Sequence, residues 1–150
     1  STGRPAPASR AEPMTGLWIA LGIVALALLI GAVRRITDGR ARTARKSSQR
    51  VDAAELGIEL APHGTFVQFS TSICAPCRAT ARLLSQITEE NPAVAHVEID
   101  AEHRMDLVER FGVLRTPTVL LVDAKGAVRY RFTGPSRRAE LVDALARLED

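Results

Sequence analysis

The feature that most constrains the fold of this chain is a stretch of 19 consecutive residues, 15–33, without a charged side chain. As a helix, this stretch would extend over about 28 Å at ~1.5 Å per residue, close to the thickness of a bilayer's hydrocarbon core. Buried helices of soluble proteins seldom stay uncharged over such a length. We therefore expect one transmembrane helix at residues 15–34, which leaves the rest of the chain to supply any globular core.

The charged residues are distributed unevenly around this helix. Residues 1–50 carry 9 Lys and Arg against 2 Asp and Glu, whereas residues 51–150 carry 11 against 15. The high pI therefore belongs to the first third of the chain, and a mildly acidic folded part argues against nucleic acid as a partner. Most of the basic residues follow the helix: Arg34, Arg35, Arg40, Arg42, Arg45, Lys46 and Arg50.

This charge bias predicts how the chain is oriented in the membrane. By the positive-inside rule, the flank richer in Lys and Arg stays in the cytoplasm. We expect a single-pass protein of the cell membrane with its C-terminal domain in the cytoplasm, and an extracytoplasmic domain is the alternative. A cleavable signal peptide would instead carry its positive charge before the apolar stretch.

Composition divides the chain into four parts. Residues 1–14 are rich in Pro and poor in large apolar side chains, so we expect a disordered leader before the transmembrane helix at 15–34. Residues 35–50 form a basic juxtamembrane linker, a composition that the anionic headgroups of a lipid bilayer attract. Residues 51–150 carry the periodic apolar patterns of a folded domain.

Within residues 51–150, helical and strand periodicities alternate. The order β-α-β-α-β-β-α predicts an α/β domain without internal repeats. The expected elements are a turn of helix at 52–56, a strand at 65–70, a helix at 75–90, a strand at 94–99, a helix at 103–111, a strand at 118–122, a turn at 123–126, a strand at 127–133 and a helix at 136–148.

Cys74 and Cys77 are the only cysteines of the chain, and they lie where the strand at 65–70 gives way to the helix at 75–90. A sulfur at the N-terminus of a helix is stabilised as the thiolate by unpaired N–H groups and the helix dipole. Half of a zinc site is the alternative interpretation, but such a site needs four ligands. His63 and His103 occupy positions typical of surface residues, so no metal is expected.

Three features together resemble the thioredoxin superfamily over roughly residues 51–150: C-A-P-C at a strand-to-helix junction, Thr116-Pro117-Thr118 opening a later strand, and a hairpin with a closing helix. The resemblance implies a thioredoxin-like α/β fold, a central mixed sheet flanked by helices, here preceded by one transmembrane helix. It also implies that Cys74 attacks a substrate disulfide and that Cys77 resolves the mixed disulfide. No cofactor is implied.

The resemblance also assigns a substrate-binding surface beside the sulfur atoms. Pro117 is expected to be cis, with the backbone of Thr116 available to pair with a bound peptide. Arg115 lies on the same loop, where it either steers an acidic partner or is simply solvated. The remaining residues that this surface would contain are Ile73, Ala75 and Pro76.

Several residues depart from the typical thioredoxin pattern. Gln68 stands where a buried aspartate lies beneath the second cysteine, and a neutral amide is unable to accept the proton of the resolving thiol. Help for Cys77 must then come from elsewhere. His96 on the adjacent strand is either a substitute base or, the interpretation we favour, an ordinary half-exposed histidine. Ile73 replaces the usual tryptophan, whereas Pro76 is kept, a feature associated with reducing proteins of the family.

These observations predict a membrane-anchored thiol–disulfide oxidoreductase, with a reductase favoured because the cytosol keeps thiols reduced. Its partners would be protein disulfide substrates, a thiol or membrane electron donor, and the lipid bilayer. Three alternatives remain open: an outward-facing envelope thioredoxin for cytochrome maturation or disulfide formation, an accessory docking subunit of a membrane complex, and a carrier of persulfide sulfur.

Overall fold

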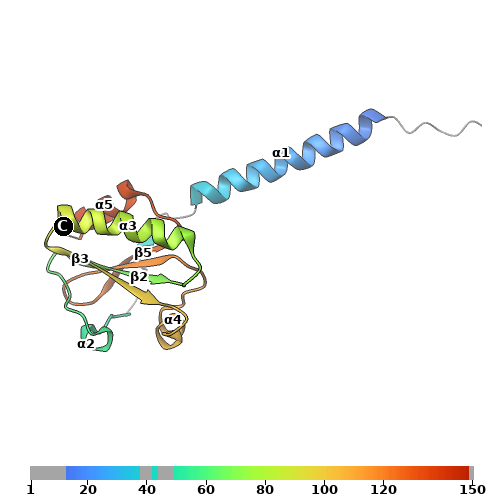
Figure 1. The fold of residues 1–150 in the computed structure, drawn as a ribbon. Helices are drawn as coiled ribbons and strands as arrows, with labels where there is room; N and C mark the ends of the chain where they lie inside the picture. Colours follow the sequence, from blue (N-terminus) through green and yellow to red (C-terminus); the bar gives the residue numbers. More distant parts are fainter. Residues whose placement is uncertain (1–12, 38–41, 44–48, 149–150) are drawn as a thin grey trace, which may run out of the picture. The chain divides into compact units, whose positions relative to one another are not determined.

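The computed structural model describes residues 13–37, 42–43 and 49–148 (Figure 1). By their contacts, the residues fall into two units, Ser1–Ile36 and Thr37–Asp150. Most of the expected leader at 1–14 and of the expected linker at 35–50 lies outside the described residues.

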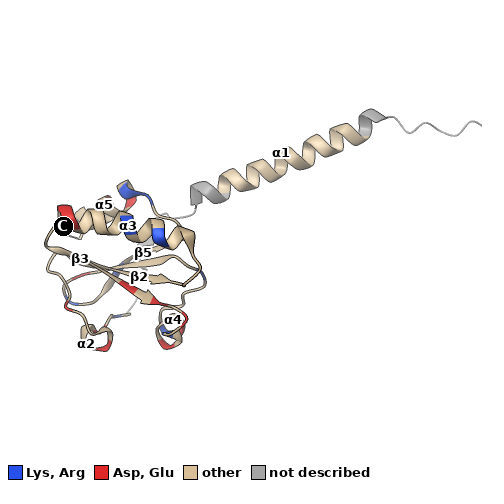
Figure 2. Ribbon diagram, viewed as in Figure 1, with Lys and Arg blue, Asp and Glu red and all other residues tan. Residues whose placement is uncertain are grey.

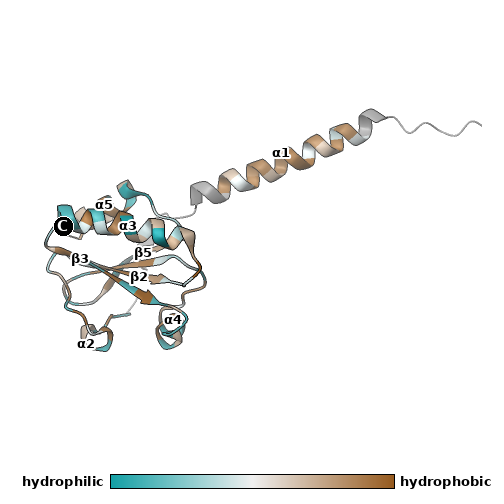
Figure 3. Ribbon diagram, viewed as in Figure 1, coloured by the Kyte–Doolittle hydropathy of each residue, from teal (hydrophilic) through white to brown (hydrophobic). Residues whose placement is uncertain are grey.

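The first unit contains one long helix, α1 (Pro13–Thr37), which covers the stretch expected at 15–34 and extends beyond it at both ends. Its segment Gly16–Val33 is long and apolar enough to cross a membrane, and none of that segment is buried against protein. Figure 3 shows apolar residues along the length of this segment. A helix that is apolar on every side needs an apolar surrounding that the unit itself does not provide.

The second unit is built on a mixed sheet with the strand order β1-β5-β4-β2-β3. The central strand β2 pairs in parallel with β3 and antiparallel with β4, and β5 pairs antiparallel with β4 and β1. The strands are β1 (Arg42–Thr43), β2 (Gly64–Ser70), β3 (Val94–Asp100), β4 (Thr118–Val122) and β5 (Val128–Thr133).

Helices cover both faces of this sheet (Figure 1). Two of them, α3 and α5, lie over one face, while α2 and α4 lie on the other. The helices are α2 (Ala53–Leu56), α3 (Ala75–Glu90), α4 (Met105–Phe111) and α5 (Arg138–Ala146). The mixed sheet flanked by helices, as expected from the sequence, is thereby confirmed.

The alternation of side chains along β2 divides the core into two clusters. Phe66 packs with Leu84 and Ile87 of α3 on one face, whereas Val67 and Phe69 pack toward α4 on the other. Gln68 belongs to the Phe66 face, so its side chain is directed toward α3 and is fully buried. This orientation brings the Gln68 amide next to the backbone of Cys77.

Some elements differ from the expected ones. The two-residue strand β1 lies in the segment expected to be a linker, and it pairs Arg42 with Arg131 at the edge of β5. Two residues are too few to give a strand periodicity in the sequence, so this strand was not expected. The helix expected at 103–111 begins only at Met105 because Asp100 holds the preceding turn through the N–H of Glu102, at 2.8 Å.

Candidate active site

Cys74 is the N-cap residue of α3, at the end of the short loop that follows β2. Its backbone is extended, and its Sγ accepts a hydrogen bond from the N–H of Cys77 at 3.2 Å. Pro76 occupies the first turn of the helix, where it forfeits no intrahelical hydrogen bond. The sulfur of Cys74 therefore faces the positive end of the helix, which favours its thiolate when the pair is reduced.

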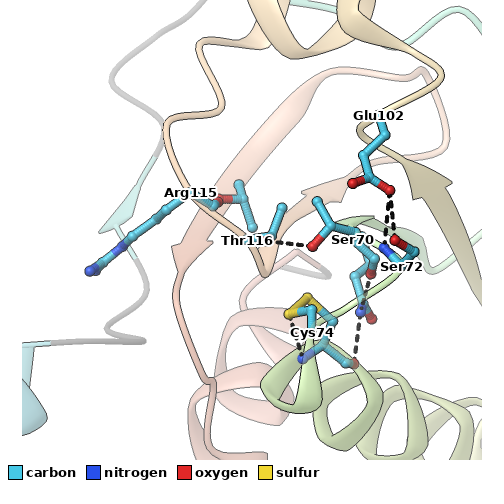
Figure 4. Close-up of a disulfide and its surroundings, with 10 residues drawn as sticks. Ser70, Ser72, Cys74, Glu102, Arg115 and Thr116 are labelled. Atoms are coloured by element: carbon cyan, nitrogen blue, oxygen red, sulfur yellow. Dashed lines mark hydrogen bonds between the residues drawn. A yellow bond between two sulfur atoms is a disulfide. The ribbon is translucent and has the colours of Figure 1, made fainter.

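Cys74 and Cys77 form a disulfide with an S–S distance of 2.05 Å (Figure 4). The two residues differ in exposure, since Cys74 is 8% exposed and Cys77 only 1%. An incoming thiolate would therefore meet the sulfur of Cys74 first. This asymmetry agrees with the roles predicted for the two cysteines, which remain predictions.

Thr116 and Pro117 lie across from the disulfide, at the start of β4. Their peptide bond is cis, as the resemblance implied. Thr116 Oγ1 is 3.4 Å from Thr71 Oγ1, which places the residue beside the loop that leads into α3 (Figure 4). The N–H of Gly134 donates to the Pro117 carbonyl at 2.8 Å, so β5 also holds this turn.

The predicted surface residue Ile73 is 95% exposed. Leu114, which sequence reasoning missed, is equally exposed at 95%, and Met105 is 54% exposed. Met105, Leu114 and Thr116 line a shallow groove of about 270 Å³ that also includes Arg115 and Glu102. In the sequence, Leu114 could have been identified as an apolar residue two positions before Thr116-Pro117.

Glu102 holds the loop that precedes Cys74. Its Oε2 accepts hydrogen bonds from the backbone N–H of Ser72 at 3.3 Å and from the Ser72 hydroxyl at 2.9 Å (Figure 4). Neither Ser72 nor Glu102 was singled out from the sequence, because nothing in their local pattern indicates a contact 30 residues apart. Figure 2 shows acidic residues near the end of β3 and on α4, while α3 carries basic residues in its N-terminal half and acidic residues at its C-terminal end.

Asp100 anchors the turn that carries Glu102. The hydrogen bond from His103, together with the backbone N–H of Glu102, lowers the pKa of the Asp100 carboxyl. Both side chains are exposed, so this contact organises the turn more than it stabilises the fold.

Arg115 lies on the predicted loop, but its guanidinium extends away from the disulfide in Figure 4. Its Nη2 is 3.5 Å from the carbonyl oxygen of Thr133 on β5. Arg115 thus borders the groove, but its charge is directed away from the sulfur atoms.

Gln68 lies beneath the first turn of α3. Its Nε2 donates two hydrogen bonds, to the Ser70 hydroxyl at 2.8 Å and to the backbone carbonyl of Cys77 at 3.0 Å. The amide therefore serves as a donor to the helix, a role that an ionised carboxylate is unable to fill.

His96 completes this buried group, since its Nε2 is 3.1 Å from Gln68 Oε1. Burial lowers the pKa of the His96 imidazole, and the nearby charge of Glu98 opposes this effect in part. Both interpretations considered for His96 missed this contact with Gln68.

A zinc site at Cys74 and Cys77 would need two further ligands nearby. Among the described residues, no group of three or more His, Cys, Asp or Glu side chains is arranged to hold a metal ion. His103 contacts Asp100, and His63 borders a cavity near the start of β2.

Comparison with known families matches residues 52–147 to the family described as Thioredoxin. The matched segment contains the disulfide, the cis-proline and the elements from α2 to α5.

Individual relatives are similar over about half of the chain. The Streptomyces coelicolor protein designated thioredoxin 2 is 27% identical over 79 residues, which cover 53% of this chain and 58% of that relative. Thioredoxin H-type from Fagopyrum esculentum is 28% identical over 80 residues, 53% of this chain and 67% of the relative.

Solved structures agree in fold. Thioredoxin NaTrxh from Nicotiana alata has a TM-score of 0.51 and 26% identity, covering 56% of this chain and 71% of its own. Chloroplastic thioredoxin z has a TM-score of 0.52 and 26% identity, covering 57% and 78%.

Proposed function

The chain belongs to the thioredoxin family through residues 52–147, and from this membership we propose that Cys74 and Cys77 carry out thiol–disulfide exchange on protein substrates. The observation that carries the proposal is the arrangement of the two sulfur atoms. Cys74 is the more exposed cysteine and is the N-cap residue of α3, while Cys77 is buried within the first turn of the same helix.

The exchange proceeds in two steps. The Cys74 thiolate attacks one sulfur of a substrate disulfide, which forms a mixed disulfide and releases the other substrate sulfur as a thiolate. The Cys77 thiolate then attacks Cys74 Sγ, which forms the Cys74–Cys77 disulfide and releases the second substrate thiolate. Two electrons from a thiol donor return the pair to the dithiol form.

The substrate would approach between Ile73 and the Thr116–Pro117 turn. Both segments border the disulfide, and the exposed Ile73 and Leu114 offer apolar contacts to a polypeptide. Residues 75 and 76 form the helical edge of the same surface.

The finer part of the proposal is that this protein is a reductase anchored in the cell membrane by α1, with its domain in the cytoplasm. It is supported by Pro76 between the cysteines, by the excess of basic residues after the apolar stretch, and by the length and composition of α1. A cytoplasmic domain would work where thiols are kept reduced.

A docking subunit of a membrane complex is the second candidate. The near-complete exposure of Ile73 and Leu114 favours it, because large apolar side chains on a surface often mark an interface. The two functions differ in turnover: a docking subunit binds its membrane partner tightly but reduces disulfides slowly.

The test uses the full chain in lipid vesicles with dithiothreitol as electron donor and insulin as the disulfide substrate. We expect insulin reduction above the rate with dithiothreitol alone, abolished by Cys74→Ser. In a separate incubation without dithiothreitol, reduced Cys77→Ser should accumulate a mixed disulfide with insulin that is visible on a non-reducing gel. Activity that survives Cys74→Ser would refute the proposed mechanism.

A further inference from the structure

We propose that His96 is a positioning residue for the resolving step: by donating to Gln68, it holds the first turn of α3, and with it Cys77, in place to attack the mixed disulfide. The inference rests on the proposed exchange reaction and adds two residues to it. It is carried by three hydrogen bonds that join β3 to the helix through one buried amide.

The Gln68 amide is fully buried, so each of its polar atoms must find a partner within the protein. Both donors of its NH₂ group are used, one by the Ser70 hydroxyl and one by the Cys77 carbonyl. The amide oxygen then faces His96 Nε2 at 3.1 Å. The reversed amide would bring two acceptors, its own oxygen and the Cys77 carbonyl, into contact.

This orientation fixes the state of the His96 ring. An amide oxygen only accepts, so Nε2 of His96 must carry a hydrogen. Burial favours the neutral ring, which is then the tautomer protonated at Nε2. His96 and Gln68 therefore act together as a donor chain directed from β3 toward the carbonyl of Cys77.

The contact matters most once the disulfide has opened. In the oxidised protein the S–S bond itself ties Cys77 to Cys74. In the mixed disulfide that covalent tie is gone, and the bond from Gln68 Nε2 to the Cys77 carbonyl still joins the turn to the sheet. Cys74 Sγ also contacts this turn, through the N–H of Cys77, but its attack on an external disulfide needs no alignment with the Cys77 sulfur and should depend much less on His96.

Substitutions at His96 and Gln68 test the proposed positioning role. His96→Leu removes the donor without adding charge, whereas His96→Gln places an amide N–H at a similar reach and should rescue. Gln68→Met keeps about the length of the side chain and removes both donors to Ser70 and Cys77 without placing a carboxylate beneath the helix.

The experiment follows the reduced full chain in detergent micelles as it reacts with 5,5′-dithiobis(2-nitrobenzoate). The first thionitrobenzoate released reports attack by Cys74, and the second reports resolution by Cys77, so one absorbance trace separates the two steps. Circular dichroism checks that each variant folds.

We expect His96→Leu and Gln68→Met to slow the second phase about tenfold, which corresponds to ~1.4 kcal/mol, the scale of one neutral hydrogen bond. The first phase should stay within about twofold, and His96→Gln should restore the second phase to within about threefold. An unchanged second phase, an equal loss in both phases, or a failed rescue by His96→Gln would overturn the inference. Failure of the proposed function is distinct, because the unaltered protein would then leave insulin reduction at the rate seen with dithiothreitol alone.

Discussion

At the scale of single residues, the site is distinguished by a neutral amide beneath the resolving cysteine. The Gln68 side chain is fully buried and donates a hydrogen bond to the Cys77 carbonyl. A carboxylate in the same place would instead be able to accept a proton. The proton of the Cys77 thiol must therefore leave by another route. The titratable group in direct contact with this amide is His96, which burial favours in its neutral form.

The shifted pKa of His96 predicts how stability depends on pH. Burial places the folded-state pKa below the ordinary value of 6.5, so the unfolded chain binds a proton at higher pH than the folded protein does. The free energy of unfolding should therefore fall as the pH drops from just above 6.5 through the folded-state pKa, and the stabilisation should be complete above that range.

Urea unfolding of the unaltered chain and of His96→Gln across pH 5 to 8 measures this effect. The variant should lose the part of the slope that His96 contributes. Asp100 and Asp106, whose pKa values are lowered from 3.8, act only at more acidic pH and are common to both proteins. Identical slopes in the two proteins would contradict the prediction.

At the scale of elements, two loops form the proposed substrate surface, the one before α3 and the one between α4 and β4. Ser72 and Glu102 fix the first loop, and the contact of Thr71 with Thr116 joins it to the second. The exposed Ile73 and Leu114 lie on these loops and contribute little to the core. Large apolar side chains this exposed often mark a contact surface for another molecule, which is the role we propose for both residues.

Leu114→Ser tests this explanation. Because the side chain is 95% exposed, its loss should change the free energy of unfolding by less than about 0.5 kcal/mol. The KM for insulin should rise several-fold while kcat stays nearly constant, since the contact binds substrate without touching the sulfur atoms.

Val142→Ser on α5 is the matched control, an exposed apolar residue on an element away from the two loops. It should leave KM unchanged. A Leu114→Ser variant with the KM of the unaltered protein would show that this side chain is not part of the substrate surface.

The same elements show how far the sequence alone was informative. The order of strands and helices followed from periodicity, and the cis bond before Pro117 followed from the family resemblance. The bonds of Gln68 to Cys77 and of Ser72 to Glu102 did not, because they join residues whose local patterns are unrelated. Likewise, Arg115 was placed on the correct loop, but the direction of its side chain depends on the carbonyl of Thr133 in β5.

At the scale of the whole molecule, two units with opposite solvent requirements share one chain. The exposed apolar surface of α1 suits a bilayer, whereas the second unit encloses its apolar residues in two clusters. The connection between them is basic, and this charge is the basis for expecting the redox domain on the cytoplasmic side. Orientation bears on the direction of exchange, since the cytoplasm keeps thiols reduced and thereby favours a reductase.

A membrane-impermeant maleimide distinguishes the two orientations. Intact cells that produce the full chain are mildly reduced, exposed to the reagent and compared with lysed cells. Because Cys74 and Cys77 are the only thiols, every label reports the side on which the active site lies. We expect labelling only after lysis, with Cys74→Ser in lysed cells showing how much of it belongs to the exposed thiol. Ready labelling of intact cells would place the domain outside and would favour an envelope thioredoxin over a cytoplasmic reductase.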